Sequence, residues 1–462
     1  MTSAIQMMIS EDNFPQVFQF AEKNSLLAKN LYNAALFRIR QVFTGWDKVN
    51  RTEHEQSVFD EIKNTKASCR SFSYRRVLSY TALRNILVTN NNPDYYAGLP
   101  MQTAEAVVKR AVFNFQNWLK ALKDWKKNPG KYTGKPCMPR YCKSAKKSFV
   151  VTNQDAVLYE CKEENATGCR LKLPGLKIPG TTKYYRIPIS YITHDDDLRE
   201  IEFKPFYGKY LMIFVINRLQ QPVGEDMPNM AGIDFGADNI AALACTDMSS
   251  VVYKGGAILS ENQVFVKRKA KAVSDLTKGH HRMHAKSKRL DALSLHHECF
   301  VKDQLHKISS SIIRFCIQHK VGTLVIGSNK YWKQDADMGK VNNQNFCSMP
   351  HYKLKQMLQY KADRAGIHMI EQEESYTSKA DITAKDCMPV YGETKTKPVF
   401  SGKRIERGLY HCSKGYCINA DCNGAANILR KAFLHAWDDV LDFRFLACPE
   451  SINFKSLNKQ EH

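Results

Sequence analysis

The sequence lacks long hydrophobic runs. Its longest apolar stretch, Tyr210–Ile216, has the length of a single β-strand, whereas a membrane-spanning helix needs about 20 apolar residues. The first residues also lack the basic and apolar regions of a secretory signal, and we find no internal repeat or low-complexity segment. We therefore expect a cytoplasmic protein that does not enter a membrane.

Acidic residues are scarce relative to basic ones. Among the 462 residues, 68 Lys and Arg outnumber 46 Asp and Glu, so the formal net charge is +22. A charge this large favours a polyanionic partner, nucleic acid first and an acidic membrane surface second. The 14 cysteines are scattered without a compact framework, so we expect reduced thiols. The length predicts two or three domains.

The chain divides into three regions of different character. From Phe14 to about Lys127, apolar residues recur every three or four positions, which predicts helices. From about residue 130, prolines and glycines separate short β-like runs, which predicts a small antiparallel barrel or sandwich. After a polar linker at Gln220–Asn229, strands and helices alternate, which predicts an α/β domain with a mixed sheet. We expect one of its strands over VVYKGGAIL, at 251–259, and its last helix from about Ala425.

Acidic residues at the ends of apolar segments are informative in so basic a chain. Asp234 ends one predicted strand, Glu373 and Glu374 end another, and Asp421 lies just before the last predicted helix. Taken singly, each suits a turn, a solvated strand end or a helix N-terminus. Together, carboxylates from three elements of one domain can hold two Mg²⁺ ions. Such ions would activate a water and stabilise the leaving oxygen of a phosphodiester.

Several motifs stand out along the chain. In the C-terminal half they are GIDFG (232–236), VIGSNKYWKQ (325–334), EESYTSKA (373–380) and NADCNGAANILRK (419–431). In the N-terminal half they are AKNLYNAALFRIRQVF (28–43), DYYAGLP (94–100) and GKPCMPRY (134–141). Together they resemble the TnpB family over essentially the whole chain, and the first four resemble its RuvC-like nuclease motifs. TnpB proteins are the RNA-guided nucleases of insertion sequences, which are related to compact type V CRISPR effectors and to Fanzor proteins.

The resemblance implies a multidomain α+β fold. Residues 14–130 would form a helical recognition domain, and residues 131–228 a β-barrel wedge domain whose first strand lies within residues 1–13. Residues 229–462 would form an RNase H-like (RuvC) α/β nuclease domain.

The resemblance also assigns a catalytic triad that holds two Mg²⁺ or Mn²⁺ ions. Asp234 matches the first catalytic Asp and Asp421 the third. Many relatives have their Glu where this chain has Gly327, but a subset that includes Fanzor uses a Glu three residues before a Thr-Ser pair, which here is Glu374. Glu373, the alternative, would point to the opposite face of a regular strand.

Many relatives carry a zinc ribbon of paired cysteines between the last two motifs. Here Ala380 takes the place of the first cysteine, and no pair with the C-x-x-C spacing remains. We therefore expect a degenerate, zinc-free insertion at about 377–418. The cysteines left in or near it are Cys387, Cys412, Cys417 and Cys422.

Two basic segments, Lys120–Lys147 and Lys267–Arg289, suit nucleic acid. In the first, aromatic residues are interleaved with the cations, which suits phosphate contacts and base stacking. The segment SFSYRRVLSY, at 71–80, is a candidate for contact with a short DNA motif, or else an ordinary amphipathic helix. The candidate nucleic-acid-binding residues are Tyr74, Arg75, Arg76, Lys126, Lys127, Lys131, Arg140, Lys143, Lys146, Lys147, Lys267, Arg268, Lys269, Lys271, Arg282, Lys286, Lys288, Arg289, Trp332 and Lys333.

The resemblance implies an RNA-guided DNA endonuclease from a prokaryote or a mobile element, associated with the nucleoid. It would read a short flanking DNA motif, open the target by guide RNA pairing and cut it at one RuvC-like site. Guide RNA and target DNA, double- and single-stranded, would be its partners, bound by one copy or by a homodimer. Two alternatives remain: an RNA-guided repressor that does not cleave, and an RNA-independent RNase H-like transposase or resolvase. The sequence does not separate a transposon-associated from a CRISPR-associated protein.

Overall fold

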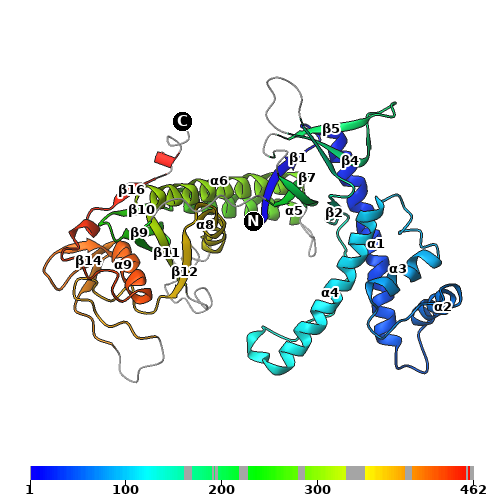
Figure 1. Ribbon diagram of the computed structural model, residues 1–462, viewed down its shortest axis with the longest axis horizontal. Helices are drawn as coiled ribbons and strands as arrows, with labels where there is room; N and C mark the ends of the chain where they lie inside the picture. The colour runs from blue at the N-terminus through cyan, green and yellow to red at the C-terminus, as the bar shows by residue number, and fades with distance from the viewer. Residues whose placement is uncertain are drawn as a thin grey trace. The chain divides into compact units, whose positions relative to one another are not determined.

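The chain folds into two compact units, Met1–Leu219 and Gln220–His462. The computed structural model describes residues 2–160, 169–189, 192, 196–217, 227–278, 287–328, 349–390, 398–453 and 456–457 (Figure 1). Among these residues, no helix is long and apolar enough to cross a membrane.

The helices of the first unit follow the predicted apolar periodicity. They are α1 (Pro15–Gly45), α2 (Glu53–Ser68), α3 (Tyr80–Thr89) and α4 (Met101–Lys127), followed by the short 3-10 helix η1 (Pro129–Lys131). Thr52 and Glu55 form a capping box at the start of α2. Ser79 accepts a hydrogen bond from the backbone N–H of Ala82 and so fixes the start of α3. Residues 71–79 precede that start and are irregular, so the amphipathic-helix alternative for SFSYRRVLSY is wrong.

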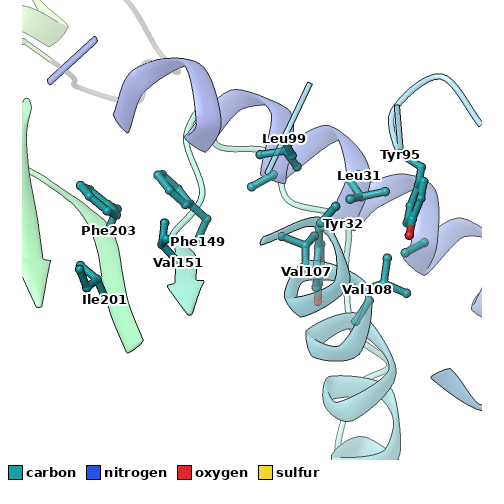
Figure 2. Close-up of a cluster of buried hydrophobic side chains, with 14 of the residues drawn as sticks. Leu31, Tyr32, Tyr95, Leu99, Val107, Val108, Phe149, Val151, Ile201 and Phe203 are labelled. Carbon is teal, nitrogen blue, oxygen red and sulfur yellow. The ribbon is translucent and has the colours of Figure 1, made fainter. Parts of the chain in front are cut away.

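Two antiparallel sheets complete the first unit. One has the order β1-β7-β6-β2, with β1 (Thr2–Ile9), β2 (Phe149–Thr152), β6 (Asp197–Phe206) and β7 (Lys209–Asn217). The other contains β3 (Val157–Glu160), β4 (Cys169–Lys177) and β5 (Tyr184–Ile189). Figure 2 shows part of the core that the first sheet shares with the helices, where Phe149 stacks on Phe203 with ring centroids 5.0 Å apart.

A six-stranded mixed sheet forms the centre of the second unit. Its order is β12-β11-β8-β9-β10-β16, with β8 (Asn229–Asp234), β9 (Asn239–Cys245), β10 (Ser250–Lys254), β11 (Val321–Ser328), β12 (His368–Glu373) and β16 (Glu450–Ile452). Strand β11 runs parallel to both β8 and β12, whereas β9 is antiparallel to β8 and β10. The carboxyl ends of β8, β11 and β12 therefore meet at one edge of the sheet.

Helices cover both faces of this sheet. Side chains from α6 (Lys288–Gln318) and α8 (His351–Ala365), with Ile258 of α5 (Gly256–Thr277), share one hydrophobic cluster with the sheet, and α9 (Ala420–Ala432) shares another. The second cluster also contains residues of a small sheet of β13 (Lys403–Glu406), β14 (Leu409–His411) and β15 (Cys417–Asn419). A short 3-10 helix, η2 (Arg444–Leu446), follows α9.

Two predicted boundaries in this unit are wrong. The strand expected over VVYKGGAIL ends at Lys254, and helix α5 begins at Gly256. The last helix begins at Ala420 rather than near Ala425, because the Asn419 side chain accepts hydrogen bonds from the backbone N–H groups of Asp421 and Cys422. Asp421 thus lies inside the first helical turn, not before it.

Candidate active site

Asp234, the last residue of β8, lies against the first turns of α9. A Cβ atom added to Gly424 would be 2.5 Å from Asp234 Oδ2. Two residues before Asp234 on β8, a Cβ atom added to Gly232 would be 2.1 Å from the carbonyl oxygen of Ala425, the residue that follows Gly424. Only glycine fits at either position without a shift of the backbone or of the Asp234 carboxylate. The glycines of GIDFG and of NADCNGAANIL therefore bring strand and helix together at this carboxylate.

Glu374 reaches the same edge of the sheet from β12. A Cβ atom added to Gly327 of β11 would lie 2.5 Å from Glu374 Oε2. The carboxylate of Glu374 therefore occupies the space above Gly327, between β12 and β8. Gly327 stands where many relatives have their catalytic Glu, and a side chain at this position would require the Glu374 carboxylate to shift.

Asp421, in the first turn of α9, is held by two side chains that the sequence did not suggest. Asn239 Nδ2 donates to Asp421 Oδ2 at 2.6 Å, from a position 182 residues earlier in the chain. The guanidinium of Arg404, on β13, lies 3.3 Å from Asp421 Oδ1. Asn239 is a buried polar residue at the start of a fully buried strand, and that pattern was a usable signal. Nothing in the sequence singles out Arg404.

The three carboxylates lie in one electrostatic environment. Burial raises the pKa of Asp234 well above its usual range, and the charges of Glu374 and Asp421 raise it further. Burial, followed by the charge of Glu373, raises the pKa of Glu374 to about 7. Oxygen Oε2 of Glu374 is buried, and no described residue makes a hydrogen bond to it. Buried carboxylates with raised pKa values and an unpaired oxygen fit a divalent cation, which would supply the missing positive charge.

The carboxylates do not by themselves form a compact chelate. Within the described ranges, no three His, Cys, Asp or Glu side chains converge closely enough to hold one metal ion. Mg²⁺ keeps several of its waters and is commonly bound through one or two carboxylates. An arrangement in which the carboxylates share one site but do not meet at one point suits that mode of binding.

Glu373, the alternative middle carboxylate, is engaged elsewhere. Its carboxylate lies 2.5 Å from Lys431 Nζ and accepts a hydrogen bond from the backbone N–H of Ser375 at 2.6 Å. The Glu373 carboxylate is therefore paired with a cation on α9, while that of Glu374 points over Gly327 toward Asp234. This geometry favours Glu374 as the third member of the set.

Hydrogen bonds organise the chain where relatives have a zinc ribbon. Ala380, which takes the place of the first cysteine, accepts hydrogen bonds through its carbonyl from Asn423 and Asn427 of α9, at 2.8 and 2.7 Å. The buried carboxylate of Asp381 accepts a hydrogen bond from the backbone N–H of Ser413 at 2.6 Å. Burial raises the pKa of Cys412 to about 12, whereas zinc binds thiolates. The absence of zinc stays a prediction.

Most of the described cations among the candidate nucleic-acid-binding residues are exposed, but two are half-buried and contact other residues of the first unit. Lys146 pairs with Glu22, and Lys147 Nζ lies 3.8 Å from the ring centre of Tyr32. The exposed cations are Lys126, Lys127, Lys131, Arg140, Lys143, Lys267, Arg268, Lys269, Lys271, Lys288 and Arg289. Arg282, Lys286, Trp332 and Lys333 lie outside the described residues.

The segment offered for the DNA motif is partly engaged in packing. Tyr74 stacks on Phe72 and packs edge-on against Trp46, with ring centroids 5.7 and 5.6 Å apart. Arg75 and Arg76 are exposed, and Arg76 lies 2.7 Å from Asp47.

The first unit also contains a groove between α4 and the sheet of β2 and β6. Its volume is about 540 Å³. The polar and aromatic side chains that line it include Lys109, Arg110, Phe113, Lys147, Glu200 and Glu202.

Two segments of the chain match known protein families, and parts of it are similar to curated proteins. Residues 218–333 match the family described as OrfB_IS605, "Probable transposase", and residues 351–428 match the Cas12f1-like TNB domain. The TnpB-like protein ORF457 of Acidianus two-tailed virus is 28% identical over 211 residues, 44% of this chain and 42% of that protein. The CRISPR-associated endodeoxyribonuclease Cas12f1 of Sulfoacidibacillus thermotolerans is 26% identical over 253 residues, 53% of each chain.

A solved structure supports the fold. The cryo-EM structure of a Cas12f1–sgRNA–target DNA complex matches 90% of this chain and 84% of that chain, with a TM-score of 0.50 at 16% identity. Two segments of the chain thus resemble the OrfB_IS605 and Cas12f1-like TNB families, its curated relatives are a TnpB-like protein and a Cas12f1 protein, and its fold resembles that of a Cas12f1 chain. The matches span about half the length of the curated relatives.

Proposed function

We propose that the protein is an RNA-guided DNA endonuclease with one metal-dependent nuclease site. The observation that carries this proposal is the meeting of Asp234, Glu374 and Asp421 at one edge of the sheet, with raised pKa values for the first two. In this proposal residues 229–462 are the RuvC-like domain. The relatives' descriptions as a TnpB-like protein and as an endodeoxyribonuclease support it.

The three carboxylates would hold two Mg²⁺ or Mn²⁺ ions. Bound there, the ions would activate a water and stabilise the leaving oxygen of a phosphodiester. Asn239 fixes the orientation of the Asp421 carboxylate through its 2.6 Å hydrogen bond. Arg404 is half-exposed beside the same carboxylate, so its guanidinium is available to a backbone phosphate at the edge of the site.

The first unit would hold the nucleic acids, with residues 14–130 as a recognition lobe and the β-rich segment as a wedge domain. Exposed cations on and after α4 in this unit, and others on α5 in the second unit, suit the phosphates of guide RNA and target DNA. The groove beside α4 is lined both by cations and by the carboxylates of Glu200 and Glu202. Carboxylates accept hydrogen bonds from base amino groups, so this groove is a second candidate, beside Tyr74, Arg75 and Arg76, for reading the short DNA motif.

A cleavage assay tests the proposal. The purified protein is mixed with guide RNA, Mg²⁺ and a plasmid that carries the matching target, and linear product is measured. Asp234→Asn, Glu374→Gln and Asp421→Asn should each abolish cleavage and leave guide RNA binding intact. Glu371→Gln is the matched control, because Glu371 lies on the same strand and pairs with Lys355 at 2.5 Å.

The outcomes separate the alternatives. Full activity in any of the three amide variants would overturn the proposed site. Target binding by the wild type without cleavage would favour the repressor. The "Probable transposase" description keeps an RNA-independent enzyme as the second candidate, and cleavage that survives complete RNase treatment would favour it.

A further inference from the structure

Lys431, near the end of α9, reaches the turn that carries Glu374. Its ammonium nitrogen lies 2.5 Å from Glu373 Oε2 and 2.9 Å from the carbonyl oxygen of Ser375. The lysine side chain is only 9% exposed. A nearly buried lysine that contacts the residues on both sides of Glu374, and that no step of the proposed reaction uses, calls for an explanation.

Few other contacts fix the position of the Glu374 side chain. Strand pairing ends one residue earlier, where Glu373 pairs with Ser328. The turn that follows contains Tyr376 at φ 67°, in the left-handed region that costs a non-glycine residue strain. Within the described part of the chain, Glu374 Oε2 accepts no hydrogen bond. The direction of the Glu374 side chain therefore depends on the position of its backbone. That position is in turn set by the contacts of the neighbouring residues.

Those neighbours are held by one face of α9. Thr377 donates to the carbonyl of Glu374 through its hydroxyl at 2.9 Å and its N–H at 3.2 Å. The carbonyl of Thr377 in turn accepts a hydrogen bond from Asn427 at 3.0 Å. Asn427 and Lys431 are four residues apart and so lie on the same face of the helix. The helix that carries Asp421 therefore also grips both sides of the Glu374 turn.

We propose that Lys431, acting through Glu373, is a positioning residue that aims the Glu374 carboxylate at the shared cation site. The inference rests on the proposed function and deepens it. Glu373 accordingly does not bind the metal; its carboxylate links Lys431 to the backbone N–H of Ser375. Without the pair the turn can relax, and Glu374 spends less time over Gly327.

The consequence is weaker metal binding. Substitution of a residue that orients a metal ligand typically lowers metal affinity or activity by about 10- to 100-fold. Lys431→Met keeps the alkyl stem and removes the ammonium group, and we expect it to raise the Mg²⁺ concentration for half-maximal cleavage by about tenfold or more. Cleavage at saturating Mg²⁺ should remain close to wild type, because Glu374 itself is present.

The experiment measures metal binding directly as well as cleavage. Mn²⁺ binding to the intact protein with guide RNA is followed by calorimetry. The same titration of Asp421→Asn measures binding at other sites, and that signal is subtracted. Lys431→Met and Glu373→Gln should both weaken Mn²⁺ binding at the site about tenfold. Lys431→Arg keeps a positive charge and should bind Mn²⁺ about as tightly as the wild type. Lys355→Met is the matched control, because it breaks a 2.5 Å pair with Glu371 on the same strand, and it should bind Mn²⁺ as the wild type does.

Each outcome supports or overturns the positioning role of Lys431, or the proposed function itself. Wild-type Mn²⁺ affinity in Lys431→Met would overturn the inference and leave the proposed function intact. A lower melting temperature with unchanged metal affinity would likewise reduce Lys431 to a packing role. A wild type that neither binds Mn²⁺ nor cleaves would refute the proposed function itself. If Lys431→Met does not fold, Glu373→Gln and Lys431→Arg still give the answer.

Discussion

Replacing Gly424 by alanine tests the close contact between α9 and the end of β8. The added methyl carbon would lie 2.5 Å from Asp234 Oδ2 and 3.2 Å from Asp234 Cγ. Carbon–oxygen contacts ordinarily measure about 3.3 Å or more, so the carboxylate must move by roughly 0.8 Å. A displacement of about 1 Å in a catalytic group can cost about 100-fold in rate. We therefore expect cleavage to fall by about two orders of magnitude.

The same substitution should not unfold the protein. Alanine in a helix is favoured over glycine by up to about 1 kcal/mol, and this gain offsets part of the cost of moving one carboxylate. The assay pairs single-turnover plasmid cleavage in Mg²⁺ with the melting temperature. Gly256→Ala is the control, because Gly256 likewise lies near the start of a helix but has nothing within 4 Å of the new methyl group. Cleavage by Gly424→Ala at the wild-type rate would refute the reasoning.

Three further predictions concern single side chains. Because the folded-state pKa of Glu374 is raised from 4.5 to about 7, the metal-free protein should lose roughly 3 kcal/mol of stability as the pH rises through that range. Urea unfolding in EDTA should show this loss, and Glu374→Gln should abolish it. Lys146→Met should lower the melting temperature without changing guide RNA affinity, whereas Lys143→Met should reduce the slope of log K against log salt by about 0.7 and leave stability unchanged. Gly327→Asp in a Glu374→Ala background should restore part of the Mg²⁺-dependent cleavage, because residue 327 then carries a carboxylate in the space that Glu374 vacates; cleavage no higher than in Glu374→Ala would contradict this.

Sequence patterns predicted the place of a candidate residue best where that residue lies at the end of a regular element. Asp234 follows an apolar run that becomes a buried strand, so its place at the sheet edge followed from the pattern. The two-residue period of a strand separated Glu373 from Glu374, since successive side chains point to opposite faces. In the structure the two carboxylates do have different neighbours.

The errors have local physical causes. The start of α9 was placed too late because Asp421, Cys422 and Asn423 are weak helix formers, but the Asn419 cap outweighs that tendency. The segment after Lys254 is apolar enough for a strand, yet it becomes helical at Gly256 and buries Ile258 against the other face of the sheet.

Two of the supporting residues, unlike Asn239, were not predictable from one sequence. Arg404 and Lys431 act through partners that only the folded chain brings near, and lysine or arginine in a basic protein is no signal by itself. Lys146 shows the opposite case, in which a sequence pattern suggests a role that the contacts of the residue do not favour. It lies in a run of cations that suggests a nucleic-acid surface, yet it pairs with Glu22 inside its own unit.

The close approach of Gly232 to Ala425 has a consequence for when activity can first appear. During synthesis the N-terminal part of a chain emerges and begins to fold first, so Asp234 is made long before helix α9. Until α9 has emerged and packed against the sheet, Asp421 is missing, and nothing grips the turn that carries Glu374. Nascent chains and fragments that stop short of α9 should therefore be unable to cut DNA, even when they already bind RNA. Under the proposed function, packing of α9 against the sheet would thus have to precede any cleavage.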